Sequence, residues 1–240
     1  MAIDSAIHRS GRDRRLYTWV AAFIPIIVLA GFARTYYLKG LFGTPALPGL
    51  LVHLHGVVMT LWVVLFVVQV WLVASRRTKV HQRLGVVGAV LAPLVICVGI
   101  LTAIAAAARA GPGPVPLRFL VIPFGDMLGF AIMLGTALYF RRRMEIHKPL
   151  MVLAAFNFVP PAIVRIPLHF IEAGGPLVFF GLTDLCVLAC VAFDTARNRR
   201  LNPAFALGTL LFVASQPLRL LLAGTDVWMR FAASLVGLMR

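Results

Sequence analysis

Residues 50–74 read LLVHLHGVVMTLWVVLFVVQVWLVA, an apolar stretch without Asp, Glu, Lys or Arg. It is longer than the roughly 20 residues that a helix needs to cross about 30 Å of hydrocarbon. Further apolar runs of this kind occur at 17–38, 84–108, 118–140, 149–172, 176–194 and 203–222. The sequence therefore predicts an all-α, polytopic integral membrane protein, a bundle of seven transmembrane helices.

The composition supports this class. Of the 240 residues, 61% are hydrophobic and only 13% are charged, which is unlike a water-soluble domain. The loops are short and no Ser/Gly-rich linker interrupts them, so we expect one transmembrane domain at 1–224. Residues 225–240 are predicted to form an amphipathic interfacial helix with Thr225 or Asp226 as N-cap. A tail that packs against another subunit is the alternative.

The net charge of +15 could suggest nucleic-acid binding, but the basic residues alternate by side along the chain. Fifteen of the 23 Lys and Arg fall before span one or between spans two and three, four and five, and six and seven. These are Arg9, Arg12, Arg14, Arg15, Arg76, Arg77, Lys79, Arg83, Arg141, Arg142, Arg143, Lys148, Arg197, Arg199 and Arg200. The positive-inside rule then predicts a cytoplasmic N-terminus and a periplasmic C-terminus in a bacterial inner membrane. Membrane lipid is the expected partner of these charges, and nucleic acid is not.

The two central basic loops resemble each other. Arg76-Arg77-x-x-x-His81-x-x-Leu84 recurs as Arg142-Arg143-x-x-x-His147-x-x-Leu150, displaced by 66 positions. This favours parallel two-helix repeats, an arrangement common in membrane folds. Two unrelated basic loops could produce the same match.

Residues 157–172, NFVPPAIVRIPLHFIE, place ionisable residues inside a proline-interrupted apolar run. At helical spacing Asn157, Pro161, Arg165 and His169 fall four apart, and Glu172 follows three later. The spacing predicts that they share one face of span five, turned towards a polar interior. Because such residues are costly at membrane depth, we expect the functional site here.

Counting residues from the outer ends of the spans places further polar residues at similar depth. His53 and His55 begin span two, and His55 is favoured because its helical face also carries Gln69. The other members expected in an outward-facing polar pocket are Tyr37, Asp126, Asp184, Gln216 and Arg219. Interhelical salt bridges that offset Arg165 and Arg219 are the purely structural interpretation.

Two kinds of cofactor suit these residues. Haem b would use His53 or His55, His169, Arg165 and Arg219, with the arginines meeting its propionates. A transition metal ion (Zn, Fe or Cu) would use His53, His55 and His169 with Asp126 or Glu172. No motif of a standard hydrolase or nucleotide-binding enzyme is present, so whether the protein is an enzyme stays open.

His81 and His147 lie in the basic loops, where helix-end or lipid contacts are the simplest role. If they formed a second ligand pair, the protein would have histidine ligands near both leaflets of the membrane. This placement of histidines resembles that of the two-haem membrane cytochromes of the b561 class. In that family the ligands lie within the spans, whereas His81 and His147 lie at span ends. The motifs His53-Leu-His55-Gly56 and His81-Gln-Arg-Leu84-Gly85 also resemble those of uncharacterised bacterial multi-span proteins, a resemblance that implies fold and no activity.

Three functions fit the sequence. The first is a periplasm-facing haem or metal site for electron transfer or redox chemistry on a membrane-soluble substrate such as a quinone. The second is a carrier or receptor of a small polar or anionic molecule, built around Arg165. The third is a non-catalytic accessory or assembly subunit of a larger membrane complex.

Overall fold

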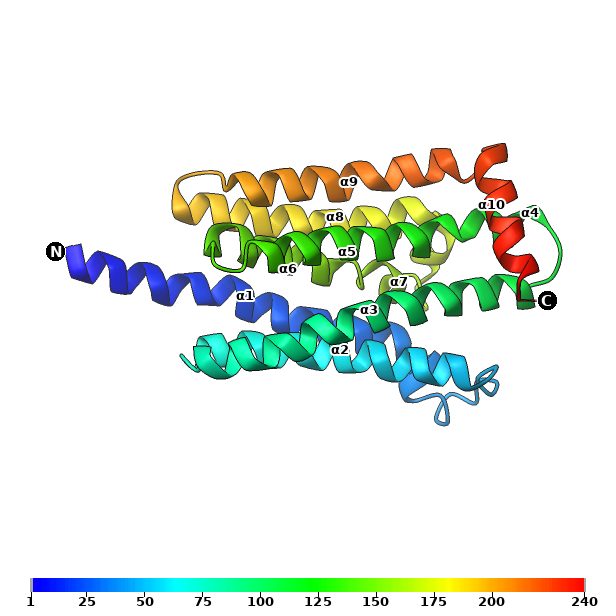
Figure 1. The fold of residues 1–240 in the computed structure, drawn as a ribbon, viewed down its shortest axis with the longest axis horizontal. Coiled ribbons are helices and arrows are strands. Elements are labelled where there is room, and N and C mark those ends of the chain that lie inside the picture. Colours follow the sequence, from blue (N-terminus) through cyan, green and yellow to red (C-terminus); the bar gives the residue numbers. More distant parts are fainter. Residues whose placement is uncertain (1, 240) are drawn as a thin grey trace.

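The computed structural model describes the backbone of residues 2–239 and the side chains of residues 16–239. The predicted cluster Arg9, Arg12, Arg14 and Arg15 therefore lies outside the described side chains. Within the described part every regular element is a helix, and turns or loops join the helices (Figure 1). The elements are α1 (Ala2–Phe32), the π-helix η1 (Ala33–Tyr37), α2 (Leu50–Ala74), α3 (Thr78–Arg109), α4 (Pro114–Phe119), α5 (Val121–Tyr139), α6 (Met144–Phe156), α7 (Pro160–Ile163), α8 (His169–Asn198), α9 (Pro203–Leu222) and α10 (Asp226–Gly237).

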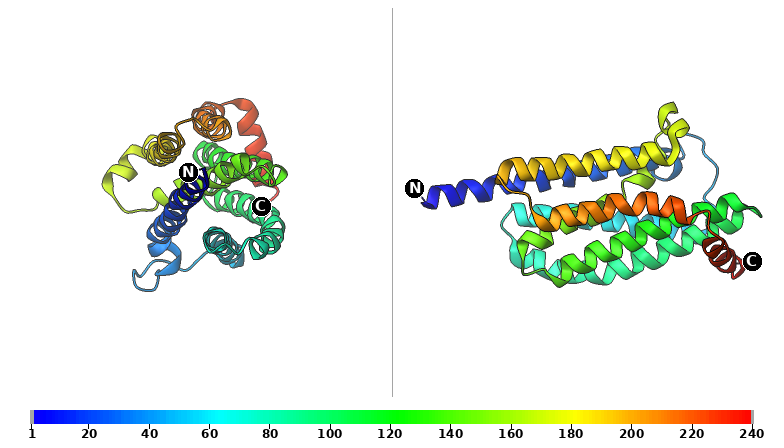
Figure 2. Two further views of the ribbon diagram at one scale, coloured as in Figure 1. Left: turned by 90° about the vertical axis from the view of Figure 1, so that its left-hand side faces the viewer. Right: turned by 90° about the horizontal axis from the view of Figure 1, so that it is seen from above.

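Seven helical stretches are long and apolar enough to cross a membrane, as the hydropathy pattern predicts. They are Leu16–Tyr37, Leu50–Ala74, Thr78–Arg109, Pro114–Tyr139, Met144–Ile163, His169–Asn198 and Pro203–Leu222. Their axes run side by side in both the long view and the end view (Figure 2). The prediction of an all-α bundle with seven spanning helices is confirmed at this level.

The span that contains α6 and α7 lies at the centre of the bundle. It is 72% buried, against 28–44% for the other six spans. α6 packs against α5, α9 and α1, and α7 packs against α1 and α8. Gly31 on α1 permits the approach of α7, because a Cβ there would clash with the backbone carbonyl of Ala162. Side chains near the break between α6 and α7 are thus enclosed by other helices.

The predicted bounds of the fifth span, 149–172, are wrong, because the structure gives Met144–Ile163. α6 ends at Phe156 with Asn157 as its C-cap, and α7 is one turn that begins at Pro160. Pro160, Pro161 and Pro167 lack backbone N–H groups, so the helical hydrogen-bond ladder cannot pass through this segment. Asn157, Arg165 and His169 therefore do not share one helical face.

α8 begins earlier than the predicted span at 176–194. Its first turn starts at His169, so His169 and Glu172 belong to the sixth span instead of the fifth. Gly175 has φ 54° and ψ −139°, which kinks the helix just before Pro176. The predicted start coincides with the part of α8 that follows this kink. Similarly, α3 starts at Thr78 instead of 84, because the polar first turn is helical as well.

α10 lies across one end of the bundle, against α3 and α4 (Figure 1). Thr225, one of the two predicted N-cap residues, caps α10. The Thr225 Oγ1 accepts the Trp228 N–H at 3.3 Å. The Trp228 indole Nε1 donates to the Leu117 carbonyl at 2.9 Å. The Phe124 ring packs edge to face against the rings of Trp228 and Phe231. These contacts attach the last helix to the chain's own bundle.

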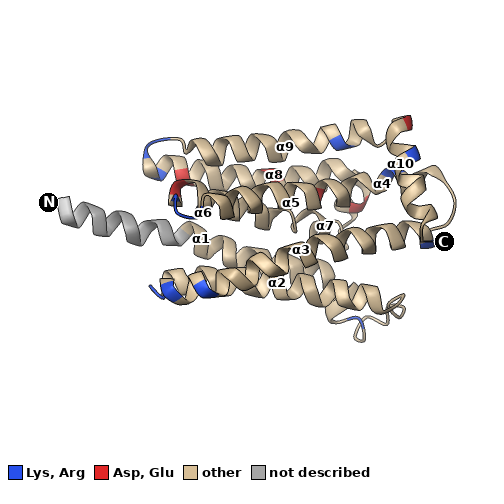
Figure 3. Cartoon of the chain, in the orientation of Figure 1, with Lys and Arg blue, Asp and Glu red and all other residues tan. Residues whose placement is uncertain are grey.

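Charged residues gather at the ends of the spans (Figure 3). The turns α2–α3, α5–α6 and α8–α9 meet at one end, which we call the basic end. Its described Lys and Arg residues are Arg76, Arg77, Lys79, Arg83, Arg141, Arg142, Arg143, Lys148, Arg197, Arg199 and Arg200. The buried ion pair described next lies between the helices, away from these turns.

Candidate functional site

A buried ion pair joins α5 to α9. Nη1 of Arg219 donates to Oδ1 of Asp126 at 2.6 Å, and the two side chains are only 8% and 7% exposed. Nη2 of Arg219 donates to the Ser215 hydroxyl one turn away at 2.9 Å. The guanidinium also lies 6.0 Å from the centre of the Phe180 ring on α8. We call Asp126, Ser215 and Arg219 the ion-pair cluster; its two charges neutralise each other inside an apolar bundle.

Two glycines on α5 make room for this cluster. A Cβ at Gly125 would clash with the Arg219 side chain, and one at Gly129 would lie 2.7 Å from Oδ1 of Asn157. Because the two glycines are four residues apart, they lie on one face of the helix. Small residues at these positions let long polar side chains lie directly against a helix backbone.

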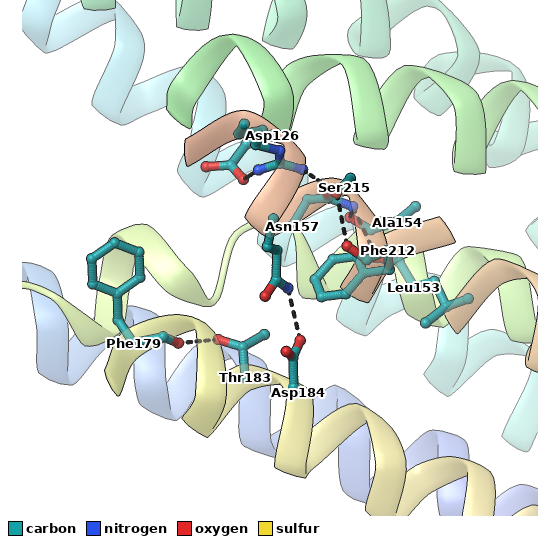
Figure 4. Close-up of polar contacts among 11 residues, drawn as sticks. Asp126, Leu153, Ala154, Asn157, Phe179, Thr183, Asp184, Phe212 and Ser215 are labelled. Atoms are coloured by element: carbon teal, nitrogen blue, oxygen red, sulfur yellow. Dashed lines mark hydrogen bonds and ion pairs between the residues drawn. The ribbon is translucent and has the colours of Figure 1, made fainter. Parts of the chain in front are cut away.

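Two more polar contacts extend the cluster towards α6 and α8 (Figure 4). The Asn157 amide donates from Nδ2 to the Leu153 carbonyl at 3.0 Å, so it satisfies a carbonyl near the end of α6. On the other side, Nε2 of Gln216 donates to Oδ1 of Asp184 at 2.7 Å. Oδ1 of Asn157 and Nε of Arg219 remain buried without a hydrogen-bond partner in the described part of the protein. Such orphan atoms are uncommon and call for a water molecule or a ligand.

A second cluster forms at the start of α2. His55 is partly buried, and its Nδ1 is fully enclosed and has no hydrogen-bond partner among the described residues. Arg165 lies on the link between α7 and α8, near enough to His55 for its charge to interact with the imidazole. We call these two residues the His55–Arg165 site. It combines an unsatisfied imidazole nitrogen with a cation.

Arg165 is held in place without a carboxylate. Nη1 donates to the Pro161 carbonyl, and the guanidinium lies 4.7 Å from the centre of the Phe32 ring at the end of α1. Within the described residues Arg165 makes no ion pair, and its side chain keeps an exposed face. Protein on its other side lowers the pKa of Arg165 by desolvation, although arginine stays charged at neutral pH. A cation in this setting is available to an anionic group.

Tyrosines surround this end of the bundle. The Tyr37 hydroxyl lies 2.9 Å from Oγ1 of Thr60, whose own hydroxyl donates to the Gly56 carbonyl. The rings of Tyr36 and Tyr37 meet edge to face at 5.2 Å. Both belong to the π-helix η1, and π-helical turns are frequent at functional sites.

The remaining predicted ligands lie apart from this site or face outwards. His53 is exposed, and its backbone carbonyl accepts the Tyr36 hydroxyl at 3.4 Å. His169 and Glu172 are exposed on the first turn of α8. Asp126 is paired with Arg219. Across the described residues, no three His, Cys, Asp or Glu side chains come together as a metal-binding group, so the predicted metal set is not assembled.

His81 and His147 form a third polar feature, at the basic end. They lie in the first turns of α3 and α6 and are close enough for their charges to interact. Nδ1 of His147 is 2.9 Å from the Ala137 carbonyl. With its amide nitrogen turned towards His81, Gln69 donates to His81 Nδ1 at 2.6 Å and accepts the Gly85 N–H at 2.9 Å. Each histidine thus contacts the end of the preceding spanning helix.

Sequence reasoning missed several residues that build these clusters. Ser215 lies four residues before Arg219, and Gly125 and Gly129 are four apart, so helical spacing carried a signal for them. No sequence pattern pointed to Phe32 or Thr60, because their roles depend on how α1 packs beside α2 and the α7–α8 link. The sequence placed the polar residues at a similar depth, whereas the structure divides them into separate clusters.

A scan of protein-family models finds no match for the chain, and neither the curated proteins nor the solved structures contain a significant match.

Proposed function

We propose that this membrane protein binds haem b or a similar acidic redox cofactor at the His55–Arg165 site and uses it in electron transfer or in redox chemistry on a membrane-soluble substrate. The observation that carries the proposal is the buried Nδ1 of His55, which has no partner and lies within reach of the Arg165 charge. Leaving a polar atom buried without a partner costs free energy. A ligand that engages both residues removes that cost.

The available groups fit a haem better than a bare metal ion. Haem iron needs one or two imidazoles, and the acidic propionates need cationic partners. His55 and Arg165 supply one of each, and the Arg165 guanidinium lies against the Phe32 ring. When bound, the haem would supply a one-electron redox couple. A zinc, iron or copper site requires three or four ligands, which the described side chains do not bring together.

Arg165, which has no carboxylate partner among the described residues, favours a second candidate, a carrier or receptor of a small anionic molecule. In that case Arg165 binds the anion directly, and the proline-interrupted segment between α6 and α8 forms the site. The two candidates differ in what the purified protein contains. A redox protein carries a coloured cofactor, whereas a carrier is colourless and binds an added anion.

We further propose that the protein is a bacterial inner-membrane protein with the basic end in the cytoplasm. This orientation follows from the positive-inside rule. We also propose that α2–α3 and α5–α6 are parallel repeats. Supporting this, α3 begins at Thr78 and α6 at Met144, 66 residues apart. Each has a first-turn histidine that contacts the preceding span, His81 through the Gln69 side chain and His147 through the Ala137 carbonyl.

The test of the main proposal is an optical spectrum of the detergent-purified protein, oxidised and then reduced with dithionite, with metal analysis of the same sample. We expect a Soret band that shifts on reduction. His55→Ala should remove the band, and Arg165→Gln should weaken cofactor retention. His53→Ala is the matched control, because His53 is two residues away but exposed, and it should keep the wild-type spectrum.

A colourless, metal-free wild type would overturn the redox proposal and leave the carrier. An unchanged spectrum in His55→Ala would also overturn the assigned site. For the carrier, stabilisation of the protein by added small carboxylates should disappear in Arg165→Gln and persist in His53→Ala. Thermal unfolding of each variant shows whether a lost signal reflects lost binding or lost folding.

A further inference from the structure

The turn between α5 and α6, at the basic end, encloses a surface pocket of about 360 Å³. The residues that line it are Tyr139, Phe140, Arg141, Arg142 and Arg143. Three consecutive arginines therefore line one pocket just beyond the end of α5. This pocket is separate from the His55–Arg165 site and plays no part in the proposed redox function.

The three arginines have no acidic partner among the side chains of residues 16–239. Arg141 reaches the Leu138 carbonyl at 3.4 Å, and the guanidinium of Arg143 lies 5.6 Å from the Phe140 ring centre. The nearest acid in sequence, Glu145, is directed to the α8–α9 turn, where it lies 3.9 Å from Arg200. An anion in the pocket would thus meet three cations without a competing carboxylate.

An apolar track leads from the pocket along the outside of α5. Leu128, Ile132 and Tyr139 fall on one side of the helix and are 62%, 49% and 79% exposed. On a spanning helix these side chains face hydrocarbon. The Tyr139 ring packs edge to face against Phe140, 4.8 Å away, so the track joins the pocket lining directly. A molecule with a phosphate at one end and an acyl chain at the other matches both features.

We propose that this pocket binds the phosphate group of an anionic membrane lipid, with an acyl chain along Leu128, Ile132 and Tyr139. Planar guanidinium groups suit phosphate oxygens because they donate two parallel hydrogen bonds. A basic pocket at headgroup depth attracts anionic lipid more strongly than isolated surface charges do. Inorganic phosphate shares the recognised group and lacks the chain, so the test includes both.

The experiment measures binding of phosphatidylglycerol to the full-length purified protein by native mass spectrometry, with phosphatidylcholine as the neutral lipid. The pocket variant is Arg142→Gln with Arg143→Gln. Its matched control is Arg76→Gln with Arg77→Gln, which removes the same charge from the α2–α3 turn at the same end. We expect the half-saturating lipid concentration to rise roughly 10- to 30-fold in the pocket variant and to stay near the wild-type value in the control.

Each outcome decides the proposal. Selective loss of phosphatidylglycerol binding in the pocket variant, with no binding of inorganic phosphate to the wild type, supports a lipid site. Phosphate binding with the same arginine dependence, without phosphatidylglycerol binding, overturns the lipid and identifies a free-anion site. If phosphatidylglycerol binding weakens equally in both variants, the basic end attracts anionic lipid in general, and the proposal of a specific pocket is overturned. Equal unfolding midpoints of the variants in lipid-free detergent establish that each is folded.

Discussion

At the scale of single residues, the Asp126–Arg219 pair should be the most sensitive polar contact in the bundle. Both side chains are buried, so removing one partner leaves the other charge uncompensated in an apolar interior. We expect Asp126→Asn to lower the free energy of unfolding by about 3–5 kcal/mol. The measurement is reversible unfolding in detergent micelles, followed by helical circular dichroism.

A double variant separates a lost pair from a lost side chain. Asp126→Asn combined with Arg219→Gln removes both charges and should be more stable than the sum of the two single changes predicts. Arg230→Gln on α10 is the control for the loss of an exposed arginine and should be nearly neutral. Additive effects of the two single changes would show that the ion pair contributes little.

Gly125 provides a second prediction at this scale. Gly125→Ala inserts a Cβ against the Arg219 side chain, which must move away from Asp126. We expect the free energy of unfolding to fall by about 1–3 kcal/mol. Gly135→Ala, on the same helix, meets nothing within 4 Å and should be neutral or stabilising, since alanine favours helices. If the two variants have the same unfolding midpoint, the close approach of Arg219 to α5 is not required.

At the scale of helices, hydropathy predicted which segments span, because transfer into hydrocarbon depends mainly on length and composition. It could not predict how the segment after Phe156 divides between two helices. Helical spacing grouped Asn157, Arg165 and His169, yet three prolines interrupt the hydrogen-bond ladder on which such spacing depends. The prolines were the better guide to the helix boundaries. Because of them α6 ends early, α7 is a single turn, and His169 belongs to α8 instead of the fifth span.

The kink in α8 gives a prediction for this element. Gly175 has a positive φ with a strongly negative ψ, a conformation essentially restricted to glycine. Gly175→Ala should cost about 1–3 kcal/mol through backbone strain alone, because no atom lies within 4 Å of the added Cβ. Gly181→Ala, further along α8 and equally free of contacts, is the control and should not destabilise. A stable Gly175→Ala protein would mean that α8 straightens readily.

At the scale of the whole molecule, the sequence predicted some of the polar residues that are buried in the bundle, such as Asp126 and Arg219, but not how the polar residues pair. Charge balance suggested that Asp126, Asp184 and Glu172 offset Arg165 and Arg219, and the structure pairs only Asp126 with Arg219. Asp184 instead bonds Gln216, and Glu172 is exposed. These differences follow from helix rotation and neighbour order, which depend on packing across the bundle. Arg165 is left without a carboxylate for the same reason, and this makes it available to a ligand.

The orientation of the bundle is the last prediction, and it rests on the charge difference between its two ends. Seven spans place the two termini on opposite sides, and the positive-inside rule places the basic end in the cytoplasm. In a variant with Cys97, Cys186 and Cys190 replaced by alanine, a cysteine at Thr44 should react with a membrane-impermeant maleimide in spheroplasts. A cysteine at Ser75, in the α2–α3 turn, should react only after the membrane is permeabilised. The reverse pattern would invert the topology and place the His55–Arg165 site towards the cytoplasm, and labelling of both positions in intact spheroplasts would show that the chain inserts in two orientations.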